Sequence, residues 1–200
     1  MRVKICGVTE EGDASFAASH GADYVGIIFA TGSKRAVSPT KAKDIVLAAR
    51  SYGAEPVAVF VDESIEQIIS SCALADIRTI QLHKRRKIEE ILLLQKHFSL
   101  FYAIAVEEDG LSEEIPSGVI PLFDAKNGGS GRPFDWKRFS PPKDRPWFLA
   151  GGLNPENVSL AIALLDPYGV DVASGVEYPS SIRKDPLLVE AFIRTAKEAL

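Results

Sequence analysis

The chain has 200 residues, 46% of them hydrophobic and 25% charged, with a formal net charge of −4, which is typical of a globular protein that forms one domain. The acidic balance argues against a nucleic-acid-binding surface, and no apolar run approaches the roughly 20 residues of a membrane-spanning helix. The two cysteines, Cys6 and Cys72, are too few for a disulfide framework and lack metal-site spacing, so we expect a cytoplasmic protein. From its length, we expect a single domain over residues 1–200.

Short apolar runs alternate with helical patterns from one end of the chain to the other. Strands are predicted over residues 3–6, 24–29, 56–61, 79–82, 100–106, 119–123, 147–150 and 170–173. Helices are predicted over residues 10–20, 39–52, 64–73, 85–97, 155–165 and 185–200. Thr9, Ser38 and Asn154 are expected to cap three of these helices, whereas residues 107–116 favour at most one turn of helix.

Strands that alternate with helices predict a parallel sheet, because each helix returns the chain to the same end of the sheet. Eight units of about 25 residues lie at the short end of the range for an eightfold barrel. We therefore predict an α/β fold, a single compact (β/α)8 TIM barrel with a reduced helix after the fifth strand.

Residues 119–136 carry the clearest sign of a functional site. An apolar run typical of a buried strand ends at Asp124, and a glycine-rich loop that contains Gly129 and Ser130 follows it. Glycines permit positive φ and let a ligand approach the backbone closely. A carboxylate at the carboxyl end of a barrel strand is expected to be a working group, although an aspartate there can also simply cap a turn.

Active sites of this barrel are built from the loops that follow the strands. Reactive, hydrogen-bonding and glycine residues gather at these positions: Cys6, Gly7, Arg35, Asp62, Gln81, His83, Asp124, Gly151, Gly152, Ser174 and Gly175. The loops after the seventh and eighth strands form the usual phosphate pocket of the fold. We therefore predict a phosphorylated small-molecule substrate, with its phosphate held by Gly151, Gly152, Ser174 and Gly175.

Cys6 and Asp124 end the first and sixth predicted strands, on opposite sides of the barrel mouth. A thiolate can remove a carbon-bound proton and a carboxylic acid can protonate a leaving oxygen, so the pair fits acid–base chemistry. A free cysteine is usually a small core residue, but the place of Cys6 before Gly7 favours chemistry. His83 is either a hydrogen-bonding residue at a strand end or a substrate contact.

Taken together, these motifs resemble those of the phosphoribosylanthranilate isomerases of tryptophan biosynthesis. The resemblance covers the whole chain, with motifs in the family's order at residues 4–9 (KICGVT), 81–83 (QLH), 124–136, 149–158 (LAGGLNPENV) and 171–177 (DVASGVE). It implies an Amadori rearrangement. The sugar ring of N-(5-phosphoribosyl)anthranilate opens, and a proton leaves C2 so that the aldose amine becomes an aminoketose.

The resemblance also implies roles for individual residues. Asp124 is the general acid on the ring oxygen, and Cys6 is the general base at C2. Arg35 matches the family's arginine for the anthranilate carboxylate, which suits a guanidinium fork. The remaining substrate-binding residues are expected to be Gln81, His83, Gly129 and Ser130. No cofactor or metal is implied, and we expect a monomer or a homodimer.

Three features depart from the family's pattern. Lys84 replaces a glycine and opens a basic run that ends at Lys87, which is either a solvated face or a source of positive potential near an anionic substrate. The loop at residues 178–185 lacks the family's proline–glycine pair. Ser130 replaces a commoner threonine and keeps the hydroxyl.

Two alternative functions remain open. A related barrel acting on the analogous histidine-pathway aminoaldose, alone or with dual specificity, would need a second glycine-rich phosphate site. The loop after the third strand, residues 62–64, is acidic and has no glycine. The other alternative is a barrel that binds the ligand or a partner subunit without turnover, against which the intact Cys6 and Asp124 argue.

Overall fold

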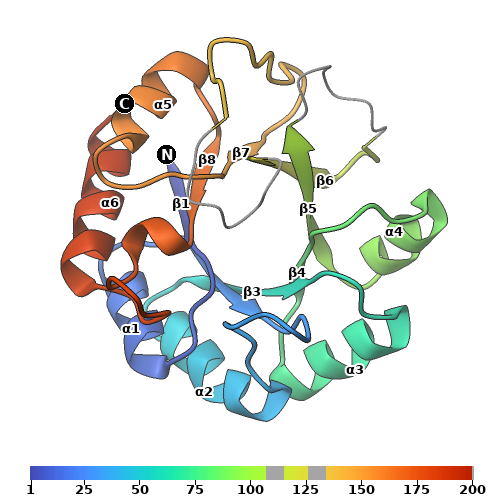
Figure 1. Cartoon of the computed structure of the whole chain (residues 1–200). Helices are drawn as coiled ribbons and strands as arrows, with labels where there is room; N and C mark the ends of the chain where they lie inside the picture. Colours follow the sequence, from blue (N-terminus) through green and yellow to red (C-terminus); the bar gives the residue numbers. More distant parts are fainter. Residues whose placement is uncertain (107–114, 126–133, 200) are drawn as a thin grey trace.

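The computed structural model is a closed barrel of eight parallel strands with helices around its outside (Figure 1). It describes residues 1–106, 115–125 and 134–199. The strands are β1 (Arg2–Ile5), β2 (Tyr24–Ile28), β3 (Glu55–Phe60), β4 (Thr79–Leu82), β5 (Ser99–Val106), β6 (Val119–Ala125), β7 (Phe148–Leu149) and β8 (Gly169–Val172). They follow one another around the barrel in chain order, and β1 pairs with β8 to close it. The predicted TIM barrel is confirmed.

The helices are α1 (Glu11–Ser19), α2 (Pro39–Arg50), α3 (Ile65–Ala75), α4 (Ile88–Gln95), α5 (Val158–Leu165) and α6 (Pro186–Glu198), with a short 3-10 helix, η1 (Ser174–Val176). Residues 115–118 and 134–147, which flank β6, contain no helix. The single helical turn predicted after the fifth strand falls mainly on residues 107–114, outside the described residues. Among the residues described, no helix has the length and apolar character needed to cross a bilayer.

The predicted helix caps are partly confirmed. Ser38 accepts a hydrogen bond from the Lys41 backbone N–H at the start of α2, as predicted. Thr9 was the wrong cap for α1, because the capping position is Glu10, and the Thr9 side chain is buried instead. The predicted start of α5 was also wrong. The Asn154 side chain accepts hydrogen bonds from the backbone N–H groups of Glu156 and Asn157, which forms a turn, and the helix begins only at Val158.

Helix α4 begins three residues later than predicted, at Ile88. The preceding basic residues are held by the loop after β3 instead of joining the helix. The guanidinium of Arg86 donates to the carbonyl oxygens of Val61 and Glu63, and the ammonium of Lys84 pairs with Asp62 at 2.5 Å. These contacts connect two neighbouring loops at the mouth of the barrel.

Side chains alternate along each strand between the barrel interior and the helices outside, as the two-residue period of a strand requires. Val3 and Ile5 of β1 pack in the larger cluster with the helices. A second cluster inside the barrel contains Phe101 and Phe148, whose rings meet edge to face. The same alternation turns Lys4 and Cys6 inward. Polar residues of the strands therefore share one enclosed interior.

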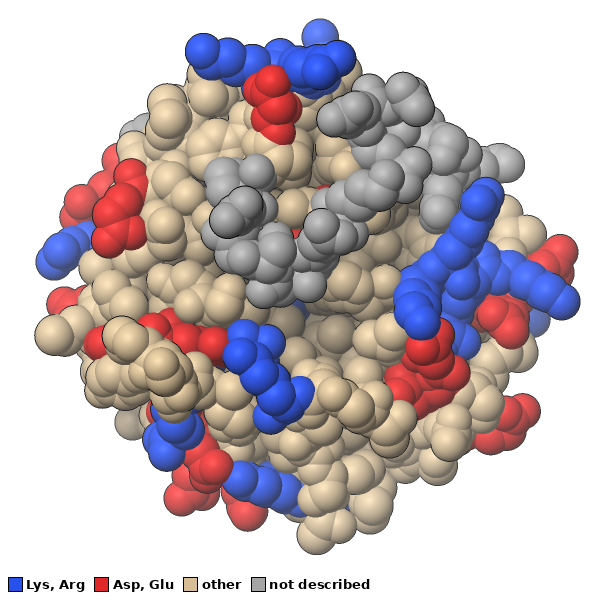
Figure 2. Space-filling model, viewed as in Figure 1, with Lys and Arg blue, Asp and Glu red and all other residues tan. Residues whose placement is uncertain are grey.

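Charged side chains of both signs are interspersed on the face of the molecule shown in Figure 2, mostly toward its periphery. The exposed ion pairs of the molecule include Lys41–Glu10 and Arg50–Asp76. Pairs of this kind stabilise a fold only weakly. The interior ion pairs, not these exposed ones, therefore matter for the site.

Candidate active site

Cys6 lies directly after β1 and faces the barrel interior, where it is 6% exposed. Its backbone N–H donates to the Val172 carbonyl of β8 at 2.8 Å, which fixes the end of the strand. A Cβ at Gly26 of β2 would lie 2.7 Å from the Cys6 Sγ and 3.1 Å from the Lys4 Nζ. Glycine at this position therefore leaves the space that the thiol and the ammonium share. Burial raises the pKa of the Cys6 thiol, and the charge of Lys4 opposes this rise.

Lys4 and Asp171 form an ion pair inside the barrel, with 3.0 Å between the Lys4 Nζ and the Asp171 Oδ1. The Lys4 side chain is fully buried. Burial disfavours its ammonium, but the carboxylate of Asp171 and the thiol of Cys6 outweigh this effect and raise the pKa of Lys4. Asp171 interacts electrostatically with both Cys6 and Asp124. The pair therefore lies within electrostatic reach of the two residues that the sequence predicted to be catalytic.

Asp124 stands near the end of β6 and faces His83, which follows β4. The His83 Nε2 lies 3.4 Å from the Asp124 Oδ2. Hydrogen bonding to this carboxylate raises the pKa of His83, although burial of the imidazole opposes the rise. The other carboxylate oxygen, Oδ1, is buried and accepts no hydrogen bond from a described residue. His83 thus lies beside the predicted acid, and one oxygen of that acid is left for another partner.

Gln81 is an interior residue of β4 and is 2% exposed. Its side-chain oxygen accepts no hydrogen bond from the residues described. Buried polar atoms normally have partners, and buried atoms without one are a feature of sites that bind a ligand or water. Gln81 and Asp124 therefore both direct a free acceptor into the interior.

The loops after β7 and β8 meet above the barrel. Gly151 and Gly152 both have positive φ, +86° and +67°, a conformation that favours glycine. A Cβ at Gly151 would lie 2.8 Å from the Asp124 Oδ1. A Cβ at Gly175 would collide with the carbonyl oxygen of Leu153. The two predicted phosphate loops are thus in contact with each other, and the first of them is in contact with Asp124.

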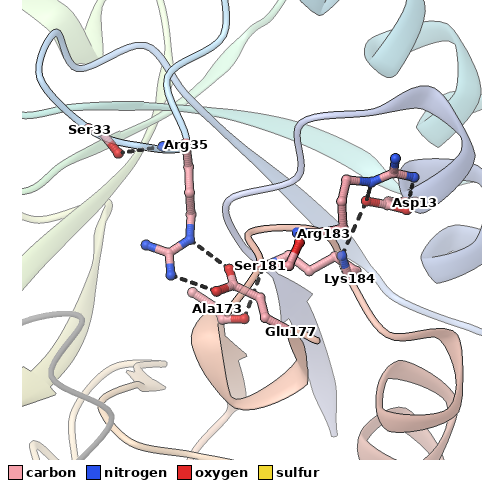
Figure 3. Close-up of polar contacts among 8 residues, drawn as sticks. All are labelled: Asp13, Ser33, Arg35, Ala173, Glu177, Ser181, Arg183 and Lys184. Carbon is pink, nitrogen blue, oxygen red and sulfur yellow. Dashed lines mark hydrogen bonds and ion pairs between the residues drawn. The ribbon is translucent and has the colours of Figure 1, made fainter. Parts of the chain in front are cut away.

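Arg35 is held by Glu177 in a two-pronged ion pair that joins the loop after β2 to the loop after β8 (Figure 3). The Arg35 Nε and Nη2 donate to the two carboxylate oxygens at 2.6 and 2.8 Å. Lys184, whose side chain is 2% exposed, also donates to Glu177 at 3.0 Å and to the Ala173 carbonyl at 2.9 Å. Arg35 and Lys184 lower the pKa of Glu177 against the effect of burial. The remaining guanidinium nitrogen of Arg35, Nη1, makes no hydrogen bond to a described residue.

The loop at residues 178–185, which departs from the expected pattern, has a defined structure. The Tyr178 N–H donates to the Arg183 carbonyl, and the guanidinium of Arg183 donates to both oxygens of Asp13 at 2.9 Å (Figure 3). Ser174 and Glu177 line a cavity of about 680 Å³ together with residues 178–182 and Lys34. The unusual loop therefore still forms a wall beside the predicted phosphate residues.

The structure brings together most of the residues that the sequence singled out. Gly129 and Ser130 lie outside the described residues. Sequence reasoning missed Lys4, Asp171, Glu177 and Lys184. The signal for Lys4 was present, because a lysine two positions before Cys6 in an apolar strand must face the interior and needs a buried partner. Among residues 1–106, 115–125 and 134–199, no cluster of His, Cys, Asp and Glu could hold a metal ion.

Comparison with known proteins identifies the family. Residues 3–195 match the family model of N-(5'-phosphoribosyl)anthranilate isomerase. The isomerase of Chlamydia caviae is 50% identical over 202 residues, which cover 100% of this chain and 98% of that protein. The crystal structure of the isomerase from Thermus thermophilus has a TM-score of 0.90, with 30% identity and complete coverage of both chains.

A second solved relative carries a ligand. This phosphoribosylanthranilate isomerase was crystallised with reduced 1-(o-carboxyphenylamino)-1-deoxyribulose 5-phosphate; it has a TM-score of 0.81 and 32% identity, and 98% of each chain is covered. The sequence matches extend over the same barrel that contains Cys6, Asp124 and the two glycine loops. The chain belongs to the N-(5'-phosphoribosyl)anthranilate isomerase family.

Proposed function

We propose that this protein converts N-(5-phosphoribosyl)anthranilate into 1-(2-carboxyphenylamino)-1-deoxyribulose 5-phosphate in tryptophan biosynthesis. Family membership over residues 3–195 supports this reaction. The observation that carries the proposal is the arrangement of the mouth: Cys6 and Asp124 face one interior, and the loop that contains Gly151 contacts Asp124. A single ligand can therefore reach a thiol, a carboxyl group and a phosphate-binding loop at once.

Acid–base chemistry at this site proceeds in three steps. Asp124 protonates the ring oxygen as the C1–O bond breaks, and the anilino nitrogen lone pair forms the C=N bond. Cys6, as thiolate, then removes the C2 proton; the C–H electron pair forms the C1=C2 bond of an enolamine while the π electrons of the C=N bond return to the nitrogen. The C2 hydroxyl finally loses its proton while C1 gains one, which gives the ketone. No net proton is gained or lost over the whole reaction.

Different residues hold the two ends of the substrate, its phosphate and its anthranilate carboxylate. We place the phosphate at Gly151, Gly152, Ser174 and Gly175. The anthranilate carboxylate accepts hydrogen bonds from Arg35, whose Nη1 is available because Glu177 occupies Nε and Nη2. Gln81 provides a further buried acceptor for a sugar hydroxyl. Holding both ends fixes C2 near the thiol, and such positioning accounts for a large part of a typical rate enhancement.

The histidine-pathway alternative is disfavoured by the loop after β3. The Glu63 carboxylate accepts hydrogen bonds from the backbone N–H groups of Val61 and Thr31. Its negative charge therefore lies where a second phosphate would bind. We also place the enzyme in the cytoplasm as a single barrel domain, either a monomer or a homodimer. One solved relative is a monomeric form of the dimeric isomerase from Thermotoga maritima.

The direct test is turnover of freshly prepared N-(5-phosphoribosyl)anthranilate, followed by the loss of anthranilate-type fluorescence. We expect a protein-dependent decay well above the rate without protein. Folding is checked on the same sample by circular dichroism. A folded protein that leaves the decay unchanged would contradict the proposed reaction and favour a barrel that only binds the ligand.

Glu177→Gln should raise KM about 10-fold while changing kcat less. The variant removes the negative charge that orients Arg35, and a hydrogen bond to a charged group contributes roughly 1.5–3 kcal/mol. Because Arg35 contacts the carboxylate and not the reacting carbon, the loss should appear mainly in binding. Steady-state kinetics measures both constants, with Glu156→Gln, a change at an exposed glutamate, as the control. An unchanged KM with a large fall in kcat would show that Arg35 does not bind the substrate.

A further inference from the structure

The two carboxylate oxygens of Asp124 lie in different surroundings. Oδ2 lies 3.4 Å from the Nε2 of His83, whereas Oδ1 is buried and accepts no hydrogen bond from a described residue. We infer that His83 is a positioning residue that supplies Asp124 with the proton that Asp124 delivers to the sugar ring. This inference rests on the proposed function, and it gives His83 a role other than the substrate contact expected from the sequence.

A supply of protons is needed because an aspartate is a poor acid at neutral pH. An unperturbed aspartic acid has a pKa of about 3.9 and is almost fully ionised at pH 7, whereas an unperturbed histidine has a pKa of about 6.5. An imidazolium next to the carboxylate is therefore a ready source of a proton near neutral pH. The side chain of His83 is 36% exposed, compared with 13% for Asp124, so His83 is the member of the pair that solvent reaches more easily.

The charges around His83 favour its protonated form. Asp124 on β6 contacts it directly and raises its pKa, and Asp171 on β8 adds to this effect from further away. Burial of the ring acts in the opposite direction. Lys84, the next residue in the chain, pairs with Asp62 at the rim. Asp124, with a smaller contribution from Asp171, thus raises the pKa of His83.

The proton transfers balance over one turnover. The N–H bond of His83 breaks with its electron pair left on Nε2, and the carboxylate of Asp124 gains the proton. Asp124 then gives a proton to the ring oxygen as the C1–O bond breaks. Solvent reprotonates the imidazole, and the proton that Cys6 takes from C2 returns to solvent. The net proton count is zero, and no further reactant is required.

The first experiment follows the imidazole directly. The chain has three histidines, so His83 can be assigned in a 1H–13C spectrum of labelled whole protein by comparison with His83→Gln. We expect His83 to titrate above its ordinary value of about 6.5 in the wild type and to move down in Asp124→Asn. An equal midpoint in the two proteins would overturn the inference. This measurement needs no substrate and therefore does not depend on the proposed reaction.

The second experiment compares pH profiles of kcat. Without His83, Asp124 has to take its proton from solvent, so His83→Gln should lower kcat about 10-fold or more at pH 7.5. The deficit should shrink as the pH is lowered toward 5.5, because Asp124 then takes its proton from solvent. His97→Gln, which replaces an imidazole located between α4 and β5, is the control. A deficit of the same size at every pH in His83→Gln, and in His83→Asn, would show a merely structural role.

Discussion

Asp124→Asn lowers kcat by about 100-fold or more, because it removes the proposed general acid while keeping the shape of the side chain. The sugar ring then has no donor for its oxygen as the C1–O bond breaks. Single-turnover kinetics with fresh substrate measures the loss. The matched control is Asp144→Asn, which changes an exposed aspartate outside the barrel mouth in the same way.

Cys6→Ala is expected to lower kcat by a similar factor, since it removes the group that takes the proton from C2. Cys72→Ala is its control, because Cys72 is also buried but lies on α3 among apolar residues. Both catalytic variants should retain their affinity for the reduced product, measured by calorimetry. Near wild-type turnover in either variant would show that the residue has a different role.

Lys4→Met is expected to destabilise the protein by about 3–5 kcal/mol, the usual cost when a buried ion pair loses one partner. The variant leaves the carboxylate of Asp171 inside the barrel without its counter-charge. Urea denaturation followed by fluorescence measures the loss. The double variant Lys4→Met/Asp171→Leu, which replaces the pair with apolar side chains, should recover most of it. Lys41→Met, which breaks an exposed pair with Glu10, should cost less than about 1 kcal/mol.

The loss in Lys4→Met should depend on pH in a defined direction. Burial raises the pKa of Asp171 in the folded state. The folded protein therefore binds more protons than the unfolded chain between the ordinary value of about 3.9 and the raised value, so stability falls as the pH rises through this window. Removal of Lys4 widens this window and so enlarges the total fall, because it takes away the cation that lowers the pKa of Asp171. A loss that is independent of pH would mean that Asp171 is not the cause.

The sequence was sufficient to predict the barrel because its strands and helices differ in period and length. Ser38 before Pro39 located the start of α2 correctly. Thr9 and Asn154 did not locate α1 and α5, since a hydroxyl or an amide caps a helix only where the local backbone brings N–H groups to it. The late start of α4 depends on Arg86, whose partners Val61 and Glu63 lie on another loop. Such a contact cannot be read from local spacing.

In the candidate site, too, some residues could be predicted from the sequence and others could not. Cys6, Asp124 and the glycines were predictable because each follows a strand, and the fold places those positions together. The partners of these residues were not predictable. Glu177 binds Arg35 across 142 positions of the chain, and His83 contacts Asp124 from a different strand. Long-range pairs of this kind depend on the register of the closed barrel and on the rotamers of long side chains.

The ion pair between Lys4 and Asp171 joins positions 167 residues apart. A ribosome therefore makes the counter-charge 167 residues after the lysine. Until that point the seam between the first and last strands stays open, and the ammonium has access to water. The ion pair and the β1–β8 seam can therefore form only after both of these strands have been made, and the Lys4 ammonium is buried only then.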